Sequence, residues 1–144
     1  MRGIVPAPFA LSGSTSVQVA SAGMTTNAVS VPVAASVPTL FTASQANSPG
    51  GIRNADGTAN SPGNPAARGS TVSMFATGLG VQPGPLVCYF DGYASAAQIV
   101  PAPTPVGIFL LSASVPANVP VSGKVSVYLT VGAAASQVVT MAVK

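Results

Sequence analysis

Histidine, glutamate and tryptophan are absent from this sequence of 144 residues, and its only acidic side chains are Asp56 and Asp91. Enzyme active sites generally need a nucleophile beside a base, a pair of acids or a set of metal ligands. Without histidine and glutamate, a serine triad, a zinc site and a glycosidase carboxylate pair are hard to build. The order Asp-Gly-Thr at Asp56 also differs from the Asp-Thr-Gly order of aspartic proteases. We therefore expect a protein with no enzymatic activity and no cofactor.

Charge is also scarce, because lysine, arginine and the two acids together make up 5% of the chain, with a net charge of +3. The five cations are separated and form no basic run, so nucleic acid is not an expected partner. No stretch reaches 18 uninterrupted apolar residues, which predicts no membrane-spanning segment. A surface so poor in charge is typical of extracellular modules and packed assemblies, and we expect an extracellular or cell-surface location.

Cysteine occurs once, at Cys88. A single cysteine excludes an intrachain disulfide and a cysteine metal cluster. Because Cys88 lies in the apolar run Leu-Val-Cys-Tyr-Phe, we expect a buried small hydrophobic side chain rather than a reactive thiol.

Short β-rich runs separated by Gly, Pro, Asn and Ser take the place of helix signals, which are almost absent. We expect strands over residues 15–20, 27–33, 71–76, 86–90, 94–100, 108–115, 124–131 and 136–143. Many short strands with such punctuation predict an all-β protein with an immunoglobulin-like β-sandwich.

An internal repeat refines this prediction. With an offset of 110 and no gap, Val5, Pro6, Ala7, Ser12, Gly13, Ser16, Val17, Val29 and Val33 meet identical residues at Val115, Pro116, Ala117, Ser122, Gly123, Ser126, Val127, Val139 and Val143. A period of 110 is about the length of one immunoglobulin-like domain. The repeat predicts that residues 1–36 are a β-hairpin from a partial repeat and residues 37–144 a complete immunoglobulin-like β-sandwich.

The segment from Val37 to Gly80 contains a Pro-x-Leu-Phe-Thr strand, a polar loop and a strand that ends in Thr-Gly-Leu-Gly. The residues concerned are Pro38, Leu40, Phe41 and Thr42, then Asn54, Asp56, Gly57, Thr58, Asn60, Ser61, Pro62, Asn64, Pro65, Ala66 and Gly69, then Thr77, Gly78, Leu79 and Gly80. In these residues the chain resembles the Solibacter uncharacterized C-terminal domain family. The resemblance implies immunoglobulin-like modules at the ends of large secreted or cell-surface bacterial proteins, with no established activity and no catalytic residues to carry over.

Two departures from the family pattern concern the middle of the chain. Only Val-Gln-Pro-Gly-Pro follows Gly80 before the next strand, where family members commonly have a longer insertion. The apolar run Gly-Ile-Phe-Leu-Leu-Ser-Ala-Ser-Val-Pro replaces a more polar strand. A shortened connection beside a more apolar strand predicts a groove.

The polar loop offers one candidate cation site. The Asp56 carboxylate, with Asn54, Asn60, Thr58 and backbone carbonyls nearby, supplies the oxygen ligands that Ca²⁺ prefers. One carboxylate is little charge for a tight site, and the favoured interpretation is an Asx turn in which Gly57 takes a positive φ.

Tyr89, Asp91 and Tyr93 form a candidate ligand-binding group, because exposed aromatic rings beside a carboxylate can stack on sugars. Strand alternation places Tyr89 and Phe90 on opposite faces, so at least one of these two rings belongs to the core.

The N-terminal hairpin gives the main functional hypothesis. A hairpin alone in water is marginally stable, and Val17, Val19, Val29, Val31 and Val33 would leave it with an uncovered apolar face. We therefore expect an extracellular structural protein that self-assembles through these strands, by strand addition or swapping, into a filament or another homo-oligomer. The alternative is a non-catalytic adhesion or binding module of a larger secreted protein, whose partner is a glycan or a cell-surface protein.

Overall fold

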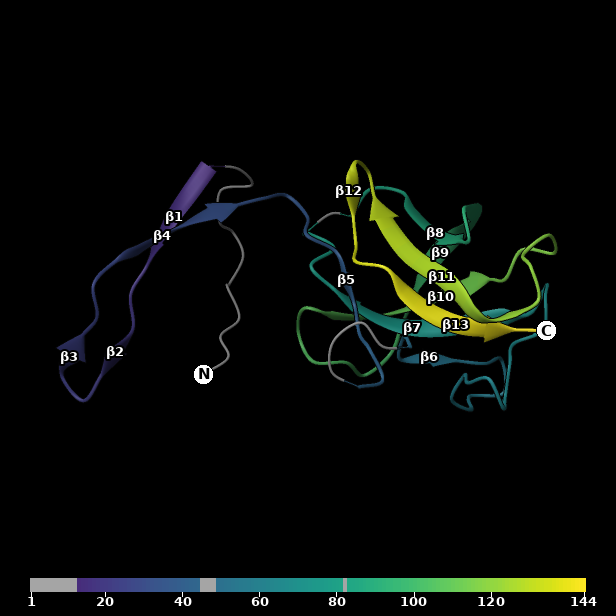
Figure 1. Ribbon diagram of the computed structural model, residues 1–144. Helices are drawn as coiled ribbons and strands as arrows, with labels where there is room; N and C mark the ends of the chain where they lie inside the picture. Colours follow the sequence, from purple (N-terminus) through teal and green to yellow (C-terminus); the bar gives the residue numbers. More distant parts are fainter. Residues whose placement is uncertain (1–12, 45–48, 82) are drawn as a thin grey trace. The chain divides into compact units, whose positions relative to one another are not determined.

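A computed structural model describes residues 13–44, 49–81 and 83–144 (Figure 1). All regular structure within these ranges is β, which confirms the all-β prediction. In the same ranges no helix is long and apolar enough to span a membrane. The chain divides into two compact units, Met1–Ala35 and Ser36–Lys144.

The described residues of the N-terminal unit form one β-hairpin with two pairs of strands. Its long strands β1 (Gly13–Val17) and β4 (Val29–Val33) pair antiparallel, and its short strands β2 (Ala20–Ser21) and β3 (Met24–Thr25) form a separate antiparallel pair next to the tip. The tip residues Ala22 and Gly23 have φ values of +49° and +78°. Positive φ at both central residues matches the right-handed twist of the flanking strands, so the local sequence closes the hairpin tightly.

The described residues of the C-terminal unit form nine strands. They are β5 (Thr39–Leu40), β6 (Ile52–Arg53), β7 (Thr71–Thr77), β8 (Leu86–Phe90), β9 (Tyr93–Val100), β10 (Ile108–Ser114), β11 (Ser122–Val131), β12 (Ala134–Ala135) and β13 (Val139–Val143). The sheet order is β12-β11-β8-β9-β10-β7-β5, with β13 paired to β11 and β6 to β7. The strand expected in the Pro-x-Leu-Phe-Thr segment contains β5, whereas the two-residue strands β6 and β12 were not predicted, because they are too short to show alternation.

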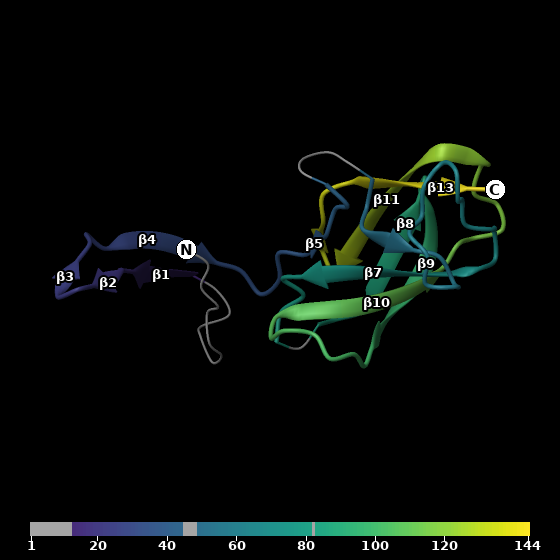
Figure 2. The same ribbon diagram turned by 90° about the horizontal axis from the view of Figure 1, so that it is seen from below.

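The sheet curls because β9 changes partner along its length. Its first half, from Tyr93, pairs with β8, and its second half, to Val100, pairs with β10. In the view of Figure 2, β11 and β13 lie above β7 and β10, and the hydrophobic residues that alternate along these strands fill the space between.

Two side-chain amides help to close the curled sheet where its ends meet. Gln137 donates from Nε2 to Leu40 O at 2.6 Å and accepts from Leu40 N at 3.2 Å. Asn60 accepts from Ala142 N at 2.7 Å and donates to Ala142 O at 2.9 Å. Each amide therefore pairs with a residue's backbone as a neighbouring strand would. Beside them, Thr140 and Val143 form parallel bridges with Pro49 and Ala66.

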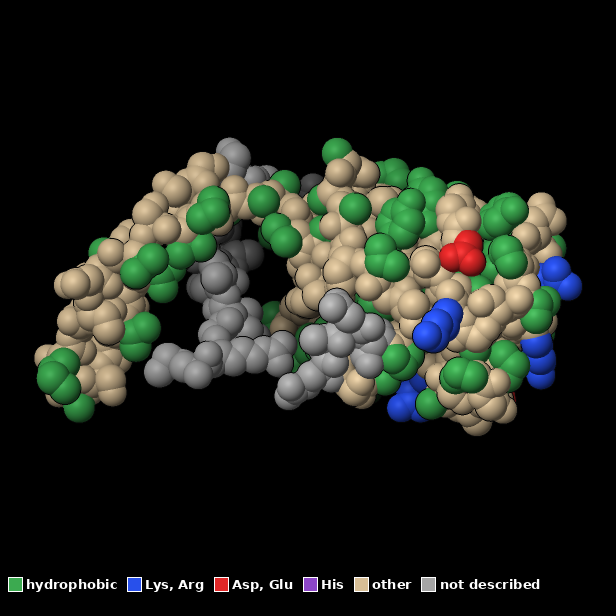
Figure 3. Space-filling view, viewed as in Figure 1, with side chains coloured by type: hydrophobic (Ala, Val, Ile, Leu, Met, Phe, Trp, Pro, Cys, Tyr) green, Lys and Arg blue, Asp and Glu red, His purple; other side chains and the backbone are tan. Residues whose placement is uncertain are grey.

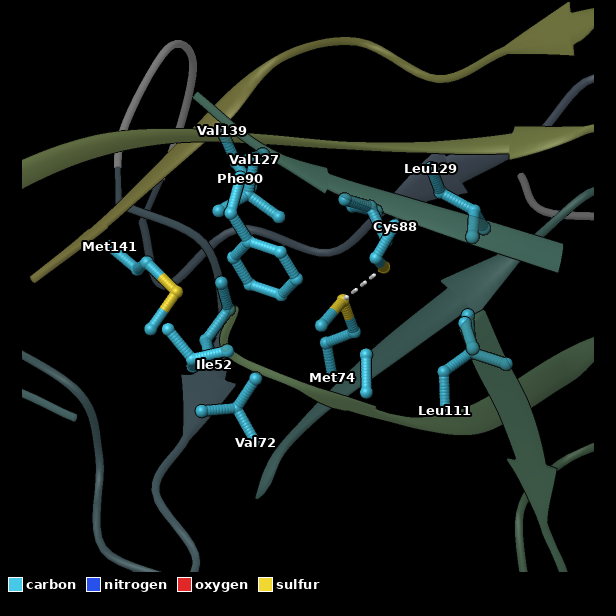
Figure 4. Close-up of a cluster of buried hydrophobic side chains, with 14 of the residues drawn as sticks. Ile52, Val72, Met74, Cys88, Phe90, Leu111, Val127, Leu129, Val139 and Met141 are labelled. Carbon is cyan, nitrogen blue, oxygen red and sulfur yellow. Dashed lines mark hydrogen bonds between the residues drawn. The ribbon is translucent and has the colours of Figure 1, made fainter. Parts of the chain in front are cut away.

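The core contains the inward residues of β7, β8, β10, β11 and β13, among them Phe90, Met74 and Leu111, which are at most 1% exposed (Figure 4). Cys88 lies among them, with its Sγ 3.7 Å from Met74 Sδ. Burial raises the pKa of the Cys88 thiol to about 12. The prediction of a buried, unreactive cysteine is therefore confirmed for its burial, and the raised pKa keeps the thiolate population low.

Candidate functional site

The polar loop after β6 keeps its acidic side chain in a local turn. Asp56 Oδ1 accepts hydrogen bonds from Thr58 Oγ1 at 2.6 Å and from Thr58 N at 3.0 Å. The hydrogen bond from the Thr58 side chain and that from the Thr58 backbone hold the pKa of the Asp56 carboxyl below its usual range. With Gly57 at φ +80°, this is the geometry of an Asx turn.

The other two calcium candidates also have structural hydrogen-bond partners. Asn54 Oδ1 accepts from Asn60 Nδ2 at 3.0 Å, and both polar atoms of Asn60 contact the backbone of Ala142. Among the described residues, no group of three His, Cys, Asp or Glu side chains lies together as a metal site. The loop is thus arranged to fasten β13 to the region after β6.

The candidate ligand residues of the β8–β9 hairpin lie apart. Tyr89 stacks on Tyr128 of β11, with ring centroids 4.8 Å apart and an interplanar angle of 7°. Tyr93 is paired with Phe90, whose side chain is buried, so it lies on the opposite face of the sheet from Tyr89. The structure therefore forms no platform from Tyr89 and Tyr93 together.

Asp91 has a structural role in the turn between those strands. It has a φ of +46°, its N donates to Ser126 O at 2.8 Å, and its Oδ1 accepts from Ser126 N at 2.7 Å. Its carboxylate therefore ties the turn to β11 rather than standing free for a ligand.

A cavity of about 670 Å³ opens on the C-terminal unit. Its apolar lining includes Phe41, Phe75 and Ile108, with Pro103 and Pro105 beyond the end of β9. Ile108 begins the apolar strand beside which the sequence predicted a groove. The described residues of the connection after Gly80, the other half of that prediction, do not line the cavity.

The two faces of the N-terminal hairpin differ in chemistry. The register places Thr15 opposite Val31 and Val17 opposite Val29, and it places serine opposite serine at the intervening pair Ser16 and Ser30. We call Val17, Val19, Val29, Val31 and Val33 the valine face. Val17, Val29 and Val31 are 45%, 61% and 40% exposed. Apolar side chains accordingly lie at the surface of this unit, in green in Figure 3.

The hairpin formed by β11, β12 and β13 has the same form at an offset of 110 residues. We call it the closing hairpin. The strand β4 at Val29–Val33 corresponds to β13 at Val139–Val143, and β3 at Met24–Thr25 corresponds to β12 at Ala134–Ala135. Val17 pairs with Val29 as Val127 pairs with Val139.

The hydrogen bonds at the bend of the two hairpins also agree. Val19 N donates to Thr26 Oγ1 at 3.1 Å, and Leu129 N donates to Ser136 Oγ at 2.9 Å. Thr26 N donates to Val19 O at 3.0 Å, and Ser136 N donates to Leu129 O at 2.8 Å. The sequence repeat is thus a repeat of side-chain contacts and, from Thr15 and Val125 to the bend, of register; nearer the open end β11 shifts register between Ser122 and Val125, and β1 does not.

The two hairpins differ in what covers them. Val127 and Leu129 are 0% exposed and Val139 is 2% exposed, because the closing hairpin packs on the core of the C-terminal unit. The corresponding positions Val17, Val19 and Val29 are 39–61% exposed. The valine face therefore has the residue pattern of a core surface, and the described residues of its own unit do not cover it.

No protein-family model, curated protein or solved structure matches the chain. The family resemblance drawn from its sequence stays a prediction, and the functional conclusions rest on the geometry above.

Proposed function

We propose that this protein is an extracellular structural protein that associates with copies of itself through the valine face of its N-terminal hairpin. The supporting observation is the contrast between the exposed Val17 and Val29 and their buried counterparts Val127 and Val139. The location is proposed from the low charge and the family resemblance.

The strength of such an association follows from the exposed area. Fully burying a valine side chain contributes about 1.5–3 kcal/mol, so burying the exposed half of a valine on association would contribute about 1 kcal/mol. Four half-exposed valines on each copy give about 8 kcal/mol for two faces, while association costs about 4–15 kcal/mol. We therefore expect self-association that is weak for a single pair and grows with protein concentration.

The edges of the hairpin restrict how strands add to it. Ala142, the counterpart of Pro32, directs its N–H away from β11 to Asn60. Proline has no N–H, so the outer edge of β4 lacks a donor at Pro32 and is a poor template for another strand. Any strand addition should use the outer edge of β1.

The strand pairing of the C-terminal unit supports an immunoglobulin-like β-sandwich. In that fold, strands A, B, E and D form one sheet and strands C, F and G form the other. The pairings β5-β7-β10-β9 and β8-β11-β13 have this arrangement, in chain order as well as in space. Such sandwiches are common in cell-surface domains, which agrees with a structural role outside the cell.

The proposal is tested by light scattering and negative-stain microscopy on the full chain and on a chain that lacks residues 1–35. We expect oligomers or filaments of the full chain that grow with concentration and disappear on truncation. A full chain that stays monomeric at high concentration, or a truncated chain that assembles equally well, would contradict the proposal.

A second candidate function is a binding module, and the partly buried Tyr89–Tyr128 pair on the outer face of β8 and β11 favours it. An aromatic pair of this kind can present a ring edge or face to a sugar or to a protein side chain. A glycan-array signal that is lost in Tyr128→Ala, while the solution mass is unchanged, would favour this function over self-assembly.

A further inference from the structure

The closing hairpin shows what kind of surface fits the valine face. In the C-terminal unit, β11 pairs along β8, with Leu129 opposite Cys88 and Val127 opposite Phe90. Its inward side chains pack on the core beside Met74 (Figure 4). We call the surface on which the closing hairpin lies the closing slot. It is formed by the edge of β8, the core and the segments that bridge β13 at Pro49 and Ala66.

The described part of the chain has two hairpins of this form and one closing slot. The slot is occupied by the closing hairpin, whose inward residues Leu129 and Met141 are larger than Val19 and Val31. A replacement by smaller side chains leaves cavities, so the N-terminal hairpin does not displace the closing hairpin. Swapping hairpins between copies of this chain does not remove the surplus, because each added copy brings two hairpins and one slot.

We propose that the N-terminal hairpin is the closing hairpin for a second β-sandwich, on a partner that has the fold of residues 36–121 and lacks a closing hairpin of its own. The hairpin would enter the partner's closing slot, with residues 17–21, the counterparts of the five β11 residues that pair with β8, paired to the partner's counterpart of β8 and the valine face on the partner's core. This is complementation by donated strands. The inference goes beyond the proposed function, because it names a partner other than a second copy.

The balance of interactions favours this partner over a second hairpin. Two hairpins packed face to face cover valine side chains and leave the backbone edge of β1 unpaired. The closing slot offers a strand edge as well, since five residues of β11 pair with β8 and the inward side chains are at most 5% exposed. A partner with both features adds backbone hydrogen bonds to the buried apolar area. Because self-association uses the same face, this partner would also dissolve the oligomers.

Cys88 gives a direct readout of an occupied closing slot. It is the single cysteine of the chain, it is 0% exposed, and it lies opposite Leu129. The probe for the partner is a chain of residues 36–121, which has an empty slot by design. The donor is the full chain with Cys88→Ala, so that only the probe reacts with a maleimide.

We expect the donor to slow maleimide labelling of the probe about tenfold when its free concentration is about ten times the Kd. A donor with Val17→Asp and Val29→Asp should give no protection. A matched donor with Ser14→Asp and Thr25→Asp, whose counterparts Lys124 and Ala135 are exposed in the closing hairpin, should protect as well as the wild type. Equal labelling rates with and without the donor, or equal protection by both variants, would overturn the inference.

A second measurement does not depend on the isolated probe. A chain shortened to residues 1–121 has one hairpin and one slot, and we expect it to unfold cooperatively in circular dichroism. The Val17→Asp, Val29→Asp version should lose that transition, and the Ser14→Asp, Thr25→Asp version should keep it. A 1–121 chain with no more cooperative structure than residues 36–121 would also overturn the inference. Neither result depends on the solution mass of the full chain, which tests self-assembly.

Discussion

Asn60→Ala should destabilise the C-terminal unit more than an ordinary amide truncation. The substitution removes the acceptor of Ala142 N, one donor to Ala142 O and one donor to Asn54 Oδ1, and Ala142 is 2% exposed. A buried donor left without a partner costs about 1–3 kcal/mol, and each other lost hydrogen bond contributes about 0.5–1.5 kcal/mol. Ala142 O keeps its bond from Ala66 N, so we expect a total loss of about 2–4 kcal/mol.

Guanidinium titration followed by circular dichroism measures this loss. The control is Asn118→Ala, which truncates the same amide at an exposed position between β10 and β11 and should change stability by less than about 0.5 kcal/mol. With about 4–8 °C per kcal/mol for a domain near this size, the Tm of Asn60→Ala should fall by about 10–25 °C. Equal stability of the two variants would refute the role of Asn60 in closing the sheet.

Three further substitutions or conditions test other parts of the structure. Gly78→Ala should lower the Tm strongly, because Gly78 has φ +72° and an added Cβ would lie 2.0 Å from Val37 O; a Tm unchanged within error would show that this approach is not as close as described. The wild type should lose stability relative to a Cys88→Ala variant as the pH rises from 9 towards 12. The folded thiol has a pKa of about 12 against 9.0 when exposed, so only the unfolded state ionises in this window. Denaturant titrations of both chains at pH 8 and pH 10.5 measure the difference in their unfolding free energies, and a difference that grows with pH would contradict the burial of the thiol. Millimolar CaCl₂ should leave the Tm within about 1 °C, because the side-chain oxygens of Asn54, Asp56 and Asn60 accept internal hydrogen bonds; a rise that Asp56→Asn removes would instead establish a calcium site.

The sequence was most informative where local pattern and burial coincide. Alternation of apolar and polar residues predicted the longer strands, and the single cysteine in an apolar run was correctly placed in the core. The ungapped offset of 110 pointed to the relation between the two hairpins, and the structure extends that relation to register and to the contacts of Thr26 and Ser136. Local sequence carries this information because each hairpin is a continuous segment with its own turn.

Contacts between distant segments were beyond local pattern. Gln137 and Leu40 are 97 positions apart, and Asn60 and Ala142 are 82 positions apart, so no spacing in the sequence reveals either amide pairing. For this reason Asn60 was considered as a metal ligand, although its side chain bonds to β13. Likewise, the aromatic residues of β8 and β9 gave a candidate sugar site because the stacking partner of Tyr89, the distant Tyr128, was not foreseen.

The most direct test of the valine face as an association surface is sedimentation velocity over a wide range of protein concentration. The wild-type chain should sediment faster as its concentration rises, and the Val17→Asp, Val29→Asp variant should remain at the monomer value. The Ser16→Asp, Ser30→Asp variant adds the same charge to the same two strands on the opposite face, and it should behave as the wild type. If all three chains sediment alike, or if the Ser16→Asp, Ser30→Asp variant alone is monomeric, the valine face is not the surface through which this protein associates.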